Sequence, residues 1–136
     1  MSVVVTLVGN LTRDAEIIEV NGGSIVKFTV ATRRPYRKKD EEEQTDFFDV
    51  SSFVPEGRDD REKESSKKIM DMRVPELRKG LQISIIEGAT LQIDKWDDKA
   101  TGEKRSKPSI FVRNLWSLNY DRKAVTQTST DEDIPF

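Results

Sequence analysis

The chain has 136 residues, enough for one domain and a tail, with 35% charged residues and a formal net charge of −2. It contains no cysteine and no histidine, which excludes disulfides and thiolate chemistry and removes the usual zinc ligands and the commonest general base. We therefore expect a binding protein, not an enzyme, with no metal or other cofactor. Because no apolar stretch could cross a membrane and the first residues do not resemble a cleavable leader, the expected location is the cytoplasm.

The negative charge lies at the end of the chain. Residues 121–136 carry four acids and two bases, so residues 1–120 are balanced. A balanced body is not the strongly basic domain typical of nucleic-acid binding proteins, and any such function would depend on local clusters of bases.

Short strands separated by turn residues are predicted from the beginning of the chain. Residues 3–8 are β-branched and apolar, and this strand is expected to stop at the turn pair Gly9-Asn10. A second strand over residues 15–20 leads into Asn-Gly-Gly at residues 21–23, a strong hairpin signal.

The strand after this hairpin alternates in the manner of a half-buried sheet. Val26, Phe28 and Val30 alternate with polar residues, so they are expected to share a buried face. Further strands are predicted in residues 46–54, 81–96 and 109–118.

One helix is predicted over residues 62–79, kinked or ended near Val74 by Pro75 and stopped by Gly80. The segment leading into it, residues 54–66, is charged and poorly patterned, so we expect an exposed loop there. About six or seven mostly antiparallel strands and one helix indicate a small sandwich or barrel.

Aromatic side chains on polar strand faces are the most informative feature. Phe47 and Phe53 share a face with Asp49 and Ser51, and Trp96 ends the polar face of residues 89–96. Tyr36 lies in a basic segment. Exposed aromatic side chains with arginines and lysines between them suit single-stranded nucleic acid, because nucleobases stack on the aromatic rings and phosphates pair with the cations. The bases expected to contact phosphate are Arg33, Arg34, Arg37, Lys38, Lys39, Lys95, Lys104 and Arg105.

Other interpretations of these residues stay open. A strand phenylalanine usually belongs to the core, where we place Phe28, Phe48 and Phe111, and the same alternative exists for Phe47 and Phe53. The acidic run at residues 40–43 could suggest a metal site, but neighbouring carboxylates in a loop lack a fixed geometry, so a solvated loop is the better interpretation.

Several segments, in order, resemble the bacterial single-stranded DNA-binding proteins (SSB). They are VTLVGNLTRDAEI, NGGSIVKFTVATRR, EEQTDFFDV, LRKGLQISIIEG and the DKW that follows, and the final DEDIPF is similar to that family's acidic tip. The resemblance implies an all-β OB-fold over residues 1–118, a five-stranded antiparallel barrel with one helix, and a disordered tail over 119–136. It also implies sequence-nonspecific binding of single-stranded DNA, with Tyr36, Phe47, Phe53 and Trp96 at stacking positions.

The resemblance implies that the last residues are a binding site for replication, recombination and repair proteins. Phe136 would fill a partner's apolar pocket and the acids would steer the encounter. The alternative of a terminal strand in the core is disfavoured by the proline and the acids. The tip comprises Asp131, Glu132, Asp133, Ile134, Pro135 and Phe136. The family resemblance also implies a homo-oligomer, a tetramer by analogy with a dimer left open, and a location on the nucleoid.

Some features depart from the family pattern. Residues 55–73 form a longer insert than usual, Phe47 replaces a tryptophan, and the linker to the tip is short, as a phage-encoded member could have. Three alternatives therefore stay open: an OB-fold module for structured RNA or protein, a decoy that carries the tip, and a nuclease using Asp46 and Asp49.

Overall fold

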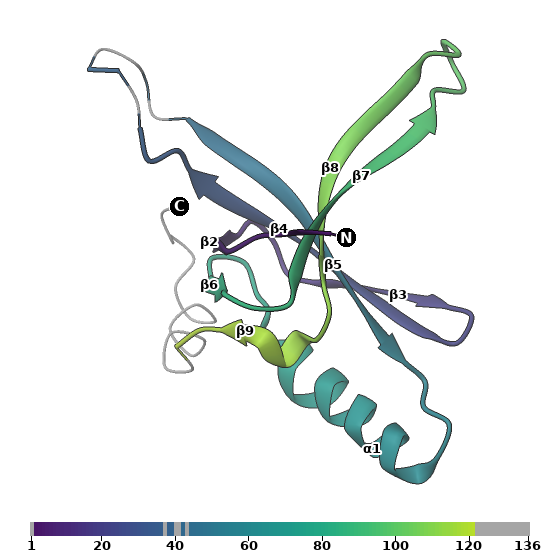
Figure 1. Cartoon of the computed structure of the whole chain (residues 1–136). Helices are drawn as coiled ribbons and strands as arrows, with labels where there is room; N and C mark the ends of the chain where they lie inside the picture. The colour runs from purple at the N-terminus through teal and green to yellow at the C-terminus, as the bar shows by residue number, and fades with distance from the viewer. Residues whose placement is uncertain (1, 37, 40–41, 43, 122–136) are drawn as a thin grey trace.

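One curled sheet carries most of the described chain (Figure 1). The computed structural model describes residues 2–36, 38–39, 42 and 44–121. Its strands are β1 (Val3–Val4), β2 (Leu7–Leu11), β3 (Glu16–Val20), β4 (Gly23–Arg33), β5 (Thr45–Pro55), β6 (Gln82–Ile85), β7 (Ala89–Asp97), β8 (Lys104–Val112) and β9 (Leu118–Asn119). They pair in the order β1-β7-β8-β5-β4-β2-β6-β9, with β3 added to β4. Within these residues the pairings are antiparallel except β5 with β8, as the short connections predicted for most of them.

The predicted turn at Gly9-Asn10 is wrong, because both residues lie inside β2. A Cβ on Gly9 would stand 2.3 Å from the carbonyl oxygen of Ala31, so glycine permits β2 to approach β4 closely. Asn10 pairs with Ala31 in the ladder, and its Nδ2 donates to the carbonyl oxygen of Gly80 at 3.1 Å. The pair therefore joins strands instead of reversing the chain.

The hairpin predicted at residues 21–23 is confirmed, with Val20 paired to Gly23. The alternation that follows is also confirmed, since Val26, Phe28 and Val30 are all buried. Their neighbours in the core come from β2, β5, β6 and β8 and from the helical segment. Residues far apart in the sequence thus supply one core on the inner face of the sheet.

The β7–β8 hairpin extends away from this core (Figure 1). Its pairing is continuous from Ala89 with Val112 to Asp97 with Lys104. Ala89 is fully buried, whereas Ile93, on the same face of β7, is 52% exposed. The sequence of β7 keeps its alternation, but its residues are exposed from Gln92 on, so few of the described residues pack against this part of the strand.

Phe111 is a correction to the predicted core. Its neighbours Ile110 and Val112 are buried, so Phe111 points to the other face of β8 and is only partly covered. Phe28 is buried as predicted, and Phe48 packs against the core from its edge.

The helix begins earlier than predicted, within the segment expected to be a loop. It comprises α1 (Asp60–Lys68), a π-helical turn η1 (Ile69–Arg73) and a 3-10 turn η2 (Val74–Glu76). The Asp59 carboxylate accepts from the N–H of Glu62 at 2.8 Å, and the Glu62 carboxylate accepts from the N–H of Arg58 at 2.7 Å. This reciprocal cap starts a helix that buries none of its own side chains.

The last described residues are held against the helical segment. The Arg73 guanidinium lies 4.8 Å from the ring centroid of Trp116, in the 3-10 turn η3 (Leu115–Ser117), and 4.7 Å from that of Tyr120. It also donates to the Trp116 carbonyl oxygen at 3.2 Å. From residue 122 on, the predicted tail lies outside the described residues. No helix in the described part is both long and apolar enough for a membrane span.

Candidate nucleic-acid interface

The face of the sheet that points away from the core is continuous across four strands. Paired residues of neighbouring strands point to the same side, and the register joins Thr29 to Asp49, Asp49 to Ser109 and Ser109 to Gln92. We call this side the outer face. Its members are Ile25, Lys27, Thr29 and Ala31 of β4, Phe47, Asp49, Ser51 and Phe53 of β5, Arg105, Lys107, Ser109 and Phe111 of β8, and Thr90, Gln92, Asp94 and Trp96 of β7.

Three of the four predicted stacking residues lie on the outer face and are accessible. Phe47 is 63%, Phe53 40% and Trp96 46% exposed. Phe47 and Phe53 are six residues apart on β5, about 20 Å along the strand. Tyr36, 90% exposed, lies instead in the connection between β4 and β5. The core alternative for Phe47 and Phe53 is therefore wrong.

The basic residues near Tyr36 flank the far end of β4. Arg33 ends this strand, and Arg34 follows it. Arg34 donates twice to the Asp46 carboxylate, from Nε at 2.9 Å and from Nη2 at 3.1 Å. This contact lowers the pKa of Asp46. Lys38 and Lys39 lie in the connection, while Arg37 and most of the acidic run lie outside the described residues.

A second group of bases surrounds Trp96 at the end of the β7–β8 hairpin. Lys95, Lys104 and Arg105 line a shallow pocket of about 500 Å³ together with Trp96. Arg105 Nε donates to the Asp98 carboxylate at 3.0 Å. The pKa of Asp98 is lowered by the N–H of Ala100 first and by Arg105 second. Each hairpin thus has an exposed aromatic side chain beside basic residues, and in each at least one arginine forms an ion pair with an aspartate.

An ion pair that the sequence did not indicate lies between the two groups. Lys107 Nζ contacts the Asp49 carboxylate, which also accepts from the Thr29 hydroxyl at 3.1 Å. Lys107 is the main cause that lowers the pKa of Asp49, and Thr29 adds to it. The sequence did not indicate Lys107 as part of this surface, and Phe111 was expected in the core. Strand parity could have placed Phe111 on the outer face, because it alternates with the apolar Ile110 and Val112, which are buried.

The nuclease alternative finds little support in this arrangement. Asp46 and Asp49 point to opposite faces of β5 and are each paired with a different base. Among the described residues, no group of three carboxylates or other ligand side chains is placed to hold a metal ion.

Residues 3–118 match the model of the single-strand binding protein family. The single-stranded DNA-binding protein of Borreliella burgdorferi is 31% identical over 127 residues, which cover 92% of this chain and 75% of that protein. That of Wolinella succinogenes is 36% identical over 126 residues, which cover 90% and 67%.

Solved structures with similar folds carry related descriptions. The Plasmodium falciparum SSB complex with single-stranded DNA has a TM-score of 0.55 at 18% identity, covering 80% of this chain and 84% of that one. The small single-stranded DNA-binding protein of Streptomyces coelicolor has a TM-score of 0.52 at 16% identity, covering 91% and 98%. At these identities the likeness concerns the fold, and it confirms the predicted OB-fold.

Proposed function

The chain belongs to the single-strand binding protein family, and from this premise we propose that it binds single-stranded DNA with little sequence preference. The observation that carries the proposal is the outer face, where Phe47, Phe53 and Trp96 are exposed on one continuous surface. Exposed aromatic side chains gathered on one face of a sheet are unusual unless they bind something.

Binding would combine stacking with charge neutralisation. Bases would stack on Phe47 and Phe53, and on Trp96 and Tyr36 towards the ends of the two hairpins. The phosphates would pair with the flanking basic side chains, which are Arg33, Arg34, Arg37, Lys38, Lys39, Lys95, Lys104 and Arg105. Because every base has a ring face and every nucleotide a phosphate, this mode does not depend on sequence.

The test is a titration of intrinsic tryptophan fluorescence with oligo-dT, a duplex and a matched RNA, each at low and high salt. The chain has two tryptophans, so the Trp116→Phe variant reports on Trp96 alone, and the Trp96→Phe variant reports on Trp116. We expect oligo-dT to quench the fluorescence of the first variant strongly. The quenching should saturate at a definite oligomer length, and binding should weaken as the salt concentration rises. Equal or absent quenching by all three ligands would favour the RNA or protein module.

We also propose that the tip, residues 131–136, recruits replication, recombination and repair proteins. The support is its sequence, since these residues lie outside the described part. Acids next to an Ile-Pro-Phe segment suit a partner with an apolar pocket and a basic rim. Deleting residues 131–136 should abolish partner binding and tighten DNA binding at low salt, where the acids compete with phosphate. Unchanged partner binding and DNA affinity would contradict both roles.

A homo-oligomer is proposed as well. Val3 and Val4 of β1, at one end of the strand order, are exposed, and so is Ile93 on β7. An apolar edge strand is a ready site for pairing with a second copy. Light scattering of the wild type and of Val4→Lys would test this, because a charge at the edge should shift the protein towards the monomer. A monomeric wild type would refute it.

A further inference from the structure

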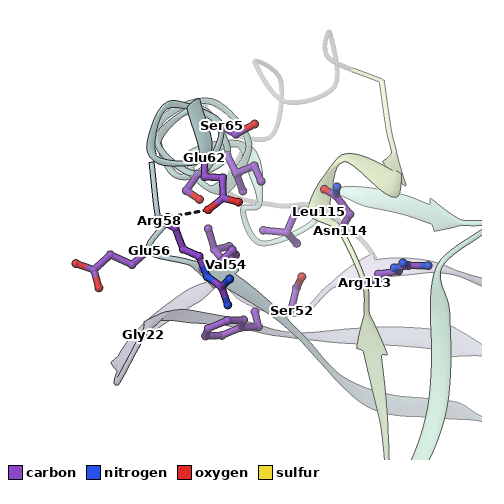
Figure 2. A pocket seen from close by; sticks show the side chains of 15 residues that line it. Gly22, Ser52, Val54, Glu56, Arg58, Glu62, Ser65, Arg113, Asn114 and Leu115 are labelled. Carbon is purple, nitrogen blue, oxygen red and sulfur yellow. Dashed lines mark hydrogen bonds between the residues drawn. The ribbon is translucent and has the colours of Figure 1, made fainter. Parts of the chain in front are cut away.

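A pocket of about 820 Å³ lies beneath the sheet, between α1 and the ends of β5 and β8 (Figure 2). We call it the α1 pocket. Its lining includes Ser52, Phe53, Arg58, Glu62 and Arg113. Its volume is within the range of roughly 300–1,000 Å³ that small-molecule sites occupy. The insert that departs from the family pattern, residues 55–73, supplies one wall.

The pocket exists because β5 and β8 separate. Their pairing ends where Ser51 meets Phe111. Beyond this point β5 continues to Pro55, whereas β8 ends at Val112 and the chain turns towards η3. The insert lines the space beside this end of β5, and Phe53 of the outer face lines it too, so the pocket adjoins that face.

A buried hydroxyl in the pocket has no partner within the part of the chain that the structure describes. Ser52 is 1% exposed, and its Oγ makes no hydrogen bond to any of these residues. In Figure 2, Ser52 and Leu115 lie between Arg58 and Glu62, on the α1 side, and Arg113, which directly follows β8. Buried hydroxyls are normally paired, so a molecule that entered the pocket and bonded Ser52 would remove an unfavourable feature of the free protein.

The two arginines of the pocket form no ion pair with the acids that the structure describes. Neither the Arg58 nor the Arg113 guanidinium has an ion-pair partner among the described residues. Glu62 also lines the pocket, but its carboxylate accepts from the backbone N–H of Arg58 in the helix cap. Glu56 is the other acid of the lining. Arg58 and Arg113 line the pocket at its two sides (Figure 2), and guanidinium groups suit a phosphate-bearing ligand.

Phe53 connects the pocket to the outer face, because it belongs to both. We propose that the α1 pocket receives the nucleotide that follows Phe53 at one end of a bound single strand. Its base lies beside Phe53 and bonds Ser52 Oγ, which can donate to or accept from any base, and its phosphates contact Arg58 and Arg113. This inference rests on the proposed function.

The experiment compares the full-length wild type with Arg58→Ala/Arg113→Ala, using labelled oligo-dT of increasing length at several salt concentrations. Arg61→Ala is the matched control, since Arg61 is an exposed base of α1 that does not line the pocket. The double variant should reach its highest affinity at a shorter length than the wild type. With long oligomers, its salt slope should fall by about 1.4, which is about 0.7 for each lost phosphate contact.

Ser52→Ala separates binding from folding. If the hydroxyl contacts a base, this variant binds long oligomers more weakly than the wild type and short ones equally well, while its melting temperature is unchanged or higher. The inference is overturned if the double variant matches Arg61→Ala at every length, or if Ser52→Ala binds like the wild type. A wild type that binds no single-stranded oligomer would instead refute the proposed function itself.

Discussion

The β4–β5 and β7–β8 hairpins have similar alternating sequences but different surroundings. Val30 and Val50 of the first are buried, whereas Ile93 of the second is largely exposed. β4 pairs with β2, and the helical segment contributes Val74 and Leu77 to the same core, but the end of β7–β8 projects away from both (Figure 1). Alternation therefore specifies a strand with two chemically different faces, and the elements packed against it decide whether the apolar face is buried.

The largest difference expected between the two hairpins is in the free energy of unfolding of their variants. Phe28→Ala should lower the free energy of unfolding by about 3–5 kcal/mol, because it removes a buried ring and leaves a cavity. Ile93→Ala should change it by less than about 0.5 kcal/mol, as for other exposed sites. Urea denaturation of both variants measures the difference. A loss above about 1 kcal/mol for Ile93→Ala would mean that a second copy covers this end of β7.

The close approach of β2 to β4 is the second test. Gly9→Ala places a methyl group 2.3 Å from the Ala31 carbonyl oxygen, so the two strands must separate, and we expect a loss of about 1–3 kcal/mol in the free energy of unfolding. Thermal or urea unfolding would measure it, with the exposed neighbour Val8→Ala as control. Equal stability of Gly9→Ala and Val8→Ala would show that β4 does not need β2 so close.

The third test asks whether both hairpins bind DNA. Phe47→Ala and Trp96→Ala should each weaken oligo-dT binding by about 1–3 kcal/mol, the range known for stacking residues in this class of protein, without changing the free energy of unfolding. Fluorescence anisotropy with labelled oligo-dT measures both, and Ile86→Ala, an exposed apolar residue outside the strands, is the control. If only Phe47→Ala weakens binding, the β7–β8 hairpin lies off the DNA path.

The smallest effect concerns the ion pair between the hairpins. Lys107 and Thr29 lower the pKa of Asp49, so the pair stabilises the fold above the ordinary range of aspartate, near pH 3.9, and this contribution is lost as the pH falls through the lowered value. Both side chains are about half exposed, so the contribution is less than about 1 kcal/mol.

Asp49→Asn tests this pair in two ways. Its stability should lie slightly below that of the wild type from pH 5 to 8 and converge with it in acid, as measured by unfolding across the pH range. Since the variant also removes a negative charge from the outer face, it should bind oligo-dT more tightly at low salt. A stability difference that grew in acid, or weaker binding, would contradict the assignment.

Local sequence determined the features that depend on neighbouring residues. The hairpin at residues 21–23, the buried alternation from Val26 to Val30 and the outward positions of Phe47 and Phe53 all follow from turn chemistry and strand parity. The order of several family segments also indicated the OB-fold, which the solved structures confirm.

Tertiary structure alone decided which faces are covered and which distant residues meet. Gly9 lies in a strand because β4 passes close to it, and Lys107 reaches Asp49 because β5 and β8 pair in parallel. The α1 pocket lies where that pairing ends, and the insert lines part of it. Strand periodicity is a local property, whereas burial and ion pairing depend on the register between segments far apart in the chain, which periodicity does not encode.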